Sequence, residues 1–256
     1  MIGTRCHLGK CSRQAGTSTG FDPRDKCRVT SAPFGFRDIV LASTAPGFGH
    51  LFAAQNPHFA RTHPVPTPNP AALTFLQNRR SRPAKTMARP VPDAAQVTEI
   101  LTAAVRVPDH GKLEPWRFVV VEGAAMVRLA DLAEARAKAL GYDAEKTAKG
   151  RGQFDLGLLA VVVISSPKPH EKVPQIEQIL SAGAVCLGIL NAAEAAGWGA
   201  NWLSGWPSHD RGFGEAAFQL STTETVAGIV HIASETNLGP DRPRPDLTRL
   251  VDWQSV

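Results

Sequence analysis

The sequence predicts an α+β domain with three layers over residues 69–256, preceded by a disordered or extended leader over residues 1–68. Three observations carry this prediction. Segments with helical spacing of apolar residues are interspersed with short runs rich in β-branched residues. The first 70 residues contain seven Gly and eight Pro and show no sustained period of 2 or 3.6. The remaining length is typical of one domain.

The first two helices are predicted from their N-terminal capping residues. Asn69 is a suitable N-cap and Pro70 suits the first helical position, so a short helix follows and ends near 79–81. A second helix follows Asp93, with apolar residues such as Val97 and Ile100 on one face, and it stops before Pro108.

The later elements follow from runs of apolar residues and from the glycines that end them. The predicted elements are a strand at 116–121 that is apolar on both faces except at Arg117, an amphipathic helix at 124–140, a central strand at 158–164, a helix at 174–196, strands at 200–203 and 226–233, and a helix near 209–218. The middle of 174–196 is apolar all round, which predicts that this helix is buried.

Composition excludes several classes of protein. Hydrophobic residues make up 43% and charged residues 20%, which excludes a wholly disordered chain. The longest apolar stretch, 179–193, is shorter than the ~20 residues of a membrane span, and the N-terminus has no apolar core of a secretory signal. We therefore expect a cytoplasmic protein that does not span a membrane.

The net charge of +5 comes from the leader. Residues 1–70 carry eight Lys and Arg against three Asp and Glu, and the other residues carry 20 of each. Cations scattered over 70 positions form no cluster, so we expect no nucleic-acid partner. A binding or regulatory module that uses the basic leader is the alternative. The Cys and His residues of the leader match no compact zinc spacing, so no metal site is expected.

Three polar stretches are candidates for function. Residues 78–82 place arginines and Ser81 at a helix end, which suits a phosphate but also suits a solvated last turn. Residues 106–116 form a loop rich in charged residues between a helix and a strand. Residues 200–206 lead from a strand into a glycine turn with two tryptophans, of which Trp202 also fits a core position. Together they offer the cations, polar groups and aromatic walls of one ligand site.

These stretches resemble, in this order, the FMN-dependent nitroreductase family, above all its small, minimal branch. The resemblance covers residues 71–250. Its motifs are Arg79-Arg80-Ser81 after a short helix, Arg106-x-Pro108-Asp109-His110 before Pro115-Trp116, and Trp202-x-Ser204-Gly205.

The resemblance implies a dimeric α-β-α sandwich with two FMN molecules at the subunit interface. It also implies NADH or NADPH as co-substrate, and nitro compounds, quinones or related small molecules as acceptors. In this reading Arg79, Arg80 and Ser81 hold the FMN phosphate and ribityl chain. Arg106 and His110 contact the same flavin from the other subunit, and Trp202, Leu203 and Ser204 line it.

The chemistry takes place on the flavin, so the resemblance implies no catalytic protein nucleophile. Arg106 is the candidate for electrostatic tuning of the reduced ring. Leu203 stands where close relatives tend to have Arg, and Glu114 where many have Gln; we expect Glu114 to point at Lys112 or solvent.

Two further interpretations stay open at this stage. A flavin enzyme of the same fold but of other outcome, reductive dehalogenation or flavin fragmentation, would carry a lid insertion, and the compact region 140–175 argues against one. The basic, Pro-rich segment with Arg242 and Arg244 fits either a tail that wraps around a partner or a solvated terminus.

Overall fold

The computed structural model describes residues 66–237 and 239–255. The chain divides into two units, Met1–Pro64 and Val65–Val256, and the description concerns the second. The predicted leader, residues 1–68, lies outside the described residues except for its last three positions.

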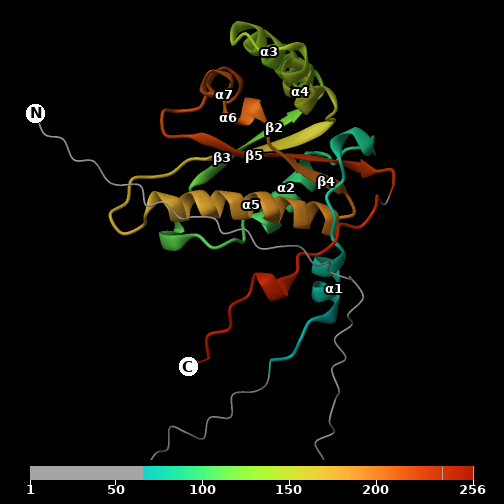
Figure 1. Cartoon of the computed structure of the whole chain (residues 1–256), viewed down its shortest axis with the longest axis vertical. Coiled ribbons are helices and arrows are strands. Elements are labelled where there is room, and N and C mark those ends of the chain that lie inside the picture. The colour runs from blue at the N-terminus through green and yellow to red at the C-terminus, as the bar shows by residue number, and fades with distance from the viewer. Residues whose placement is uncertain (1–65, 238, 256) are drawn as a thin grey trace, which may run out of the picture. The chain divides into compact units, whose positions relative to one another are not determined.

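A five-stranded sheet forms the middle layer of the domain (Figure 1). Its strands are β1 (Met87–Ala88), β2 (Trp116–Glu122), β3 (Leu159–Ser165), β4 (Gly199–Leu203) and β5 (Thr225–Glu235). β5 pairs with β1, β3 and β4, and β2 lies at the edge beyond β3. Every one of these pairings is antiparallel. Helices cover both faces of the sheet, which confirms the α+β prediction.

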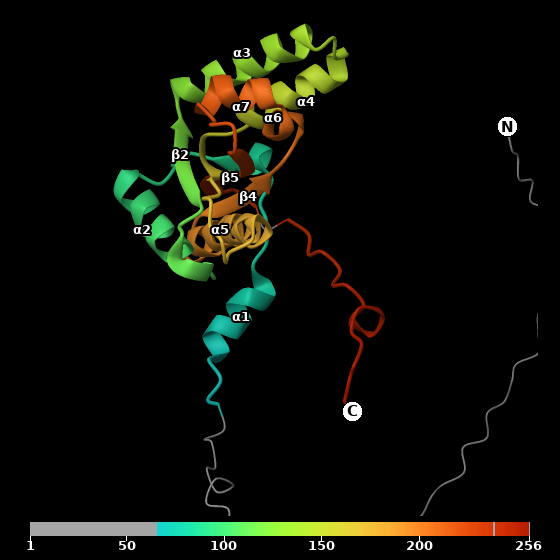
Figure 2. The ribbon, with the colours of Figure 1, turned by 90° about the vertical axis from the view of Figure 1, so that its left-hand side faces the viewer.

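The helices form the two outer layers (Figures 1 and 2). On one face lie α2 (Ala94–Ala104) and α5 (Gln175–Ala195), and on the other lie α3 (Ala124–Ala139), α4 (Ala144–Asp155), α6 (Trp206–His209) and α7 (Arg211–Phe218). The short helix α1 (Pro70–Asn78) leads into the domain, and short 3-10 turns lie at Ala84–Thr86, His110–Lys112 and Leu247–Arg249.

The side chains of β3 alternate between the two faces of the sheet and so contact both outer layers of helices. They alternate because successive residues of a strand face opposite sides. Val161 and Val163 pack into the core beneath α2 and α5, whereas Val162 packs into the core beneath α3 and α7. All seven residues of β3 are buried, as predicted for a central strand.

The capping residues start the first two helices where they were predicted. The Asn69 side chain accepts a hydrogen bond from the N–H of Ala72 at 3.1 Å. Asp93 and Gln96 form a capping box, in which each side chain accepts from the backbone N–H of the other at 2.9 and 3.0 Å. Each such cap contributes about 1 kcal/mol to helix stability.

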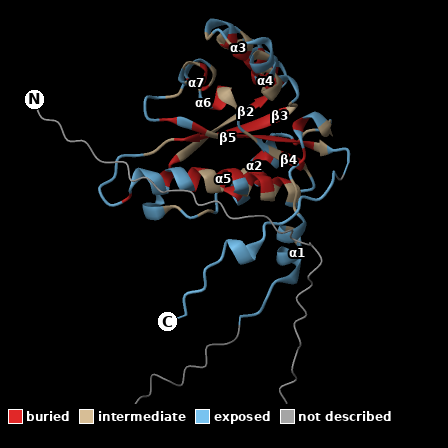
Figure 3. Ribbon diagram, in the orientation of Figure 1, coloured by how far each residue is buried: buried red, intermediate tan, exposed pale blue. Residues whose placement is uncertain are grey.

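The prediction that the helix at 174–196 is buried all round is wrong. α5 has 21 residues and is long and apolar enough, by length and composition, to cross a bilayer. One face lies in the core of the domain, where Val185 and Ile189 are fully buried. The opposite face is exposed, with 66% of Leu180 open to solvent, and no residue of α1 is buried (Figure 3).

Three other elements differ from the predictions. α4 was not predicted, and it packs against α3. The helix expected near 209–218 is two helices, because Asp210 ends α6 and caps α7 by accepting the N–H of Phe213 at 2.6 Å. The strand expected to be apolar on both faces is the edge strand β2, where Val120 is exposed.

Candidate functional site

Arg79, Arg80 and Ser81 follow the end of α1 and run beside β4. The N–H of Arg82 donates to the carbonyl of Ala200 at 2.8 Å, which fixes this segment against the strand that carries Trp202 and Leu203. The Arg82 side chain pairs with Glu235 of β5. The structure therefore brings the first and third of the three candidate stretches together.

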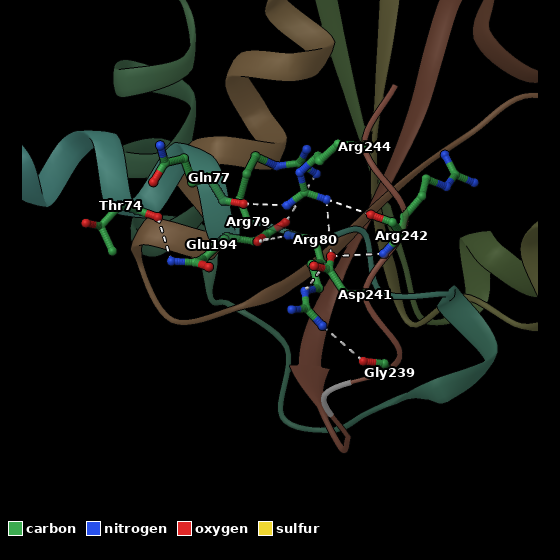
Figure 4. A network of polar contacts seen from close by, with 10 residues as sticks. Thr74, Gln77, Arg79, Arg80, Glu194, Gly239, Asp241, Arg242 and Arg244 are labelled. Atoms are coloured by element: carbon green, nitrogen blue, oxygen red, sulfur yellow. Dashed lines mark hydrogen bonds and ion pairs between the residues drawn. The ribbon is translucent and has the colours of Figure 1, made fainter. Parts of the chain in front are cut away.

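Glu194, near the end of α5, holds both arginines (Figure 4). Its Oε2 accepts the backbone N–H of Arg80 at 2.9 Å, and its Oε1 lies 3.6 Å from Nη2 of Arg79. Nη2 of Arg79 also lies 3.5 Å from Oγ of Ser81. The Glu194 side chain is 13% exposed, so a carboxylate and two arginines share a largely desolvated corner.

Three buried polar atoms at this corner have no hydrogen-bond partner among the described residues. They are Nε of Arg79, Oδ1 of Asn191 and Oε1 of Glu194. Buried polar atoms are normally paired, and each unpaired one costs about 1–3 kcal/mol. One donor and two acceptors on neighbouring residues fit a ligand that carries both an anionic group and hydroxyl groups, as FMN does with its phosphate and ribityl chain.

A C-terminal segment, residues 239–244, contacts the same arginines, and we call it the strap (Figure 4). Nη1 of Arg80 donates to the carbonyl of Gly239 at 3.2 Å, and Nε of Arg80 lies 3.5 Å from Oδ1 of Asp241. Nη2 of Arg244 donates to the carbonyl of Gln77 in α1 at 2.6 Å. The strap thus joins α1 to the segment that follows β5.

The pKa of the Asp241 carboxyl is held below its ordinary value. Partial desolvation raises this pKa, but the hydrogen bond from Arg244 and the charges of Arg244 and Arg80 outweigh it. Asp241 is therefore a carboxylate at neutral pH.

The β4 side of the site is aromatic. The Trp202 ring packs on Gly228 of β5, where a Cβ would lie 2.1 Å from Nε1 of the indole, so only glycine admits the ring there. Trp202 remains 37% exposed, Leu203 is half-buried, and Oγ of Ser204 lies 3.0 Å from Nε2 of His209. Trp202 lies two positions along β4 from Ala200, whose carbonyl accepts the N–H of Arg82.

His110 lies elsewhere, at the beginning of α5, and Arg106 follows the end of α2. Nδ1 of His110 is 2.7 Å from Oε2 of Glu177, and Oγ of Ser181 donates to the carbonyl of Pro108 at 2.6 Å. Arg106 is exposed. These bonds fasten the loop after α2 to the first turns of α5.

Asp109 shapes that loop. Its carboxylate accepts the backbone N–H groups of Leu113 and Glu114 at 3.1 and 2.9 Å. Lys112 and Glu114 both have positive φ, which side-chain-bearing residues rarely adopt, so the carboxylate stabilises a strained turn. The Glu114 side chain is exposed.

α5 separates the two halves of the predicted site. Glu177 and Glu194 are 17 positions apart on this helix, which corresponds to about 26 Å at 1.5 Å per residue. Within one chain, the structure therefore does not bring His110 to the arginines that follow α1, and Arg106 makes no hydrogen bond or ion pair with them among the described residues. One chain carries the two halves at opposite ends of one helix.

Sequence reasoning did not predict that three residues, Asn191, Glu194 and Asp241, belong to this corner. A usable signal for two of them exists, because Asn191 and Glu194 are polar residues three positions apart in the last turns of an apolar helix. Residues three apart lie on the same helix face. Asp241 gave no such signal among the arginines that surround it in the sequence.

Comparisons with known proteins identify the family. The sequence profile of the Nitroreductase family matches residues 76–234. The Escherichia coli (strain K12) protein named "Putative NAD(P)H nitroreductase YdjA" is 32% identical over 182 residues, which cover 69% of this chain and 98% of that protein.

Solved structures share the fold. The nitroreductase-like family protein from Bacillus cereus has a TM-score of 0.61 at 21% identity, covering 74% of this chain and 98% of that one. A variant of the FMN and NADPH-dependent nitroreductase NfnB from Sphigopyxis sp. has a TM-score of 0.57 at 18% identity, covering 72% and 98%. The profile match and the curated relative show that the chain belongs to the nitroreductase family, a family of oxidoreductases.

Proposed function

We propose that the protein is an FMN-dependent NAD(P)H oxidoreductase that reduces nitroaromatic compounds, quinones or related small acceptors. The names of its relatives support the co-substrate, and the named cofactor of NfnB supports FMN. The observation that carries the proposal is the buried Nε of Arg79, which has no hydrogen-bond partner among the described residues, together with the buried side-chain oxygens of Asn191 and Glu194 that accept no hydrogen bond there.

In this proposal Arg79 and Arg80 bind the phosphate, because guanidinium groups bond anionic oxygens in pairs. Ser81 adds a hydroxyl donor, and the Oδ1 of Asn191 and the Oε1 of Glu194, which accept no hydrogen bond among the described residues, accept hydrogen bonds from ribityl hydroxyls. Trp202, Leu203 and Ser204 line the ring system. Bound FMN supplies the redox chemistry, taking a hydride from NAD(P)H and passing it to the acceptor in ping-pong order.

We also propose a homodimer with the flavin at the subunit interface. A two-fold axis perpendicular to α5 that packs the exposed faces of two α5 helices together places the beginning of one helix beside the end of the other. Arg106 and His110 of one subunit then complete the site that Arg79 and Arg80 of the other subunit begin. Arg106 in that place adds positive charge where negative charge develops on the reduced ring.

The exposed side chains of α5 support this arrangement. Ile176, Leu180 and Leu187 are exposed, and a Cβ at Gly183 between them would meet no atom within 4 Å. This stripe repeats every three or four residues, which is the pattern of a helix that packs against a second helix. A contiguous exposed apolar patch indicates an interaction surface.

Two less detailed parts of the proposal follow from the sequence. The functional domain is residues 69–256, and the leader is not needed for flavin binding.

Cys186 is buried and free, and burial raises the pKa of its thiol to about 12. A single buried thiol needs no oxidising compartment, and we propose that the protein is cytoplasmic.

The visible absorption spectrum of the purified full chain tests the proposal. We expect flavin absorption that is bleached by NADH or NADPH under anaerobic conditions and restored by a quinone or a nitroaromatic compound. A colourless protein that remains unchanged after addition of FMN would contradict the proposal. Bleaching by neither nicotinamide would retain a flavoprotein but contradict the oxidoreductase assignment.

A further inference from the structure

Asp241 in the strap competes with any anion for the Arg80 guanidinium. Its Oδ1 accepts the backbone N–H of Arg242 at 2.9 Å and lies 3.2 Å from Nη1 of Arg244 and 3.5 Å from Nε of Arg80. One carboxylate oxygen is thus shared by two arginines and a backbone amide (Figure 4).

The strap engages both of the edges through which Arg80 can bind an anion. A guanidinium offers paired N–H groups along its Nε–Nη2 edge and along its Nη1–Nη2 edge. Nε faces Asp241, and Nη1 donates to the carbonyl of Gly239. A phosphate that binds Arg80 through two nitrogens therefore replaces one of these strap contacts.

The ion pair between Asp241 and Arg80 has a weaker geometry than two other arginine–carboxylate pairs of the chain, so an anion can displace it more easily. Arg117 grips Glu224 with Nε and Nη2 at 2.7 and 2.9 Å, and Arg136 grips Asp210 with the same atoms at 2.7 and 3.1 Å. Arg80 reaches Asp241 with one nitrogen at 3.5 Å, and 54% of the Asp241 side chain is exposed. A long, single, exposed ion pair contributes little stability.

The charges at the corner also favour displacement of Asp241 by a phosphate. Glu194 already offsets Arg79, and Asp241 offsets Arg80 and Arg244. A phosphate dianion that enters this corner meets two carboxylates as well as the arginines. Asp241, which is 54% exposed and lies outside any helix or strand, is more easily displaced than Glu194, which is 13% exposed and lies on α5.

We propose that Asp241 is a specificity-determining residue that competes with the flavin phosphate for Arg80 and couples the strap to occupancy of the phosphate site. This inference rests on the proposed function. It predicts that Asp241 lowers the affinity for FMN, which carries a phosphate, and leaves the affinity for riboflavin, which lacks one, unchanged.

The test compares the dissociation constants of FMN and riboflavin for the full chain, freed of flavin by dialysis and titrated by flavin fluorescence quenching. Asp241→Asn keeps the size and the hydrogen-bonding oxygen of the side chain and removes its charge. We expect about two- to tenfold tighter binding of FMN, on the scale of one partly exposed ion pair and one repulsion, with no change for riboflavin.

The matched control is Asp246→Asn. Asp246 lies five positions further along and bonds the N–H and hydroxyl of Thr248, at 3.0 and 2.7 Å. The control variant makes the same change in net charge in the same tail, so a tightening of FMN binding equal to that of Asp241→Asn would mean a general charge effect and would overturn the inference. Combining Asp241→Asn with Arg80→Ala should abolish the gain, because the contested guanidinium is gone.

The outcomes separate this inference from the proposed function. If the wild-type chain binds FMN and Asp241→Asn leaves its FMN affinity unchanged, or tightens FMN and riboflavin binding equally, the inference is overturned and the flavin site stands. If the wild-type chain binds neither flavin, the proposed function and the inference fall together.

Discussion

Arg79 has long contacts for an arginine in a desolvated corner. Its Nη2 lies 3.5 Å from Ser81 and 3.6 Å from Glu194, and its Nε has no partner among the described residues. A guanidinium in this state has donors to spare for an anion. This is the residue on which the assignment of the phosphate site most depends.

Arg79→Ala should weaken FMN binding by about 1.5–3 kcal/mol, the scale of a hydrogen bond to a charged group. Flavin fluorescence titration measures the change. Arg128→Ala on α3, across the sheet from α1, is the control and should leave the affinity as it is. Equal affinities for wild type and Arg79→Ala would place the phosphate elsewhere.

His231 makes stability depend on pH. It is fully buried in β5, and neither ring nitrogen has a hydrogen-bond partner among the described residues. Burial lowers the pKa of His231 to about 4, against a weaker opposing effect of the Gln153 backbone. In the unfolded chain the imidazole titrates near pH 6.5. Between these values the unfolded chain binds a proton that the folded chain does not.

The free energy of unfolding should therefore fall as the pH falls from 6.5 towards 4, and it should be about 2 kcal/mol lower at pH 5 than at pH 7. Urea denaturation at the two pH values measures the difference. His231→Gln has no titrating ring, so its difference should be smaller by that amount. A variant with the wild-type pH dependence would show that His231 is not the responsible group.

At the scale of the element, α4 packs so closely against Trp206 that position 150 has no room for a side chain. A Cβ at Gly150 would lie 2.3 Å from Nε1 of Trp206, whose N–H donates to the carbonyl of Lys146 at 3.0 Å. The Trp206 ring also packs edge-on to Tyr142, with centroids 5.4 Å apart. The indole is fixed on two sides and has little room to move.

Gly150→Ala should destabilise the fold by about 1–3 kcal/mol through overpacking, although alanine favours a helix more than glycine does. Gly152 on the same helix is the matched comparison, because a Cβ there makes an ordinary contact of 3.6 Å with Leu156. Gly152→Ala should stabilise the fold by up to about 1 kcal/mol. Thermal denaturation distinguishes them, and a stabilising Gly150→Ala would mean that Trp206 does not pack on α4.

The elements that could be predicted are those with local signals. Asn69 and Asp93 cap their helices through residues three positions away, so sequence alone places those helix starts. α4 has two glycines and few apolar residues, and its stability comes from packing on α3 and Trp206, far away in the sequence. The exposed face of α5 was predicted to be buried because it is apolar. A sequence does not distinguish an apolar face that the same chain covers from one that the same chain leaves exposed.

The same division holds for the candidate site. Arg79, Arg80 and Ser81 are recognisable because they are adjacent in the sequence. Glu194 meets Arg80 across 114 positions, and Asp241 meets it through the strap, so their roles depend on the tertiary structure. The separation of His110 from the arginines is likewise a property of the length of α5.

At the scale of the whole molecule, the proposed homodimer depends on the exposed face of α5. If it forms as proposed, Leu180→Lys should convert the dimer into a monomer and weaken flavin binding, because each proposed site uses residues of both chains. The protomer should remain folded, since the side chain is exposed within it. Light scattering after gel filtration measures the mass, and Val127→Lys, an equally exposed site on α3, should stay dimeric. A monomeric wild type would contradict the assembly.

The opposite placement of Arg79 and His110 along α5 has a genetic consequence. In the proposed homodimer, two chains that are each inactivated at a different end should rescue one another when they assemble as a mixed pair. In such a pair one site carries both substitutions and the other carries neither. A mixture of Arg79→Ala and His110→Ala chains should therefore recover up to about a quarter of the wild-type sites after random reassortment of the subunits.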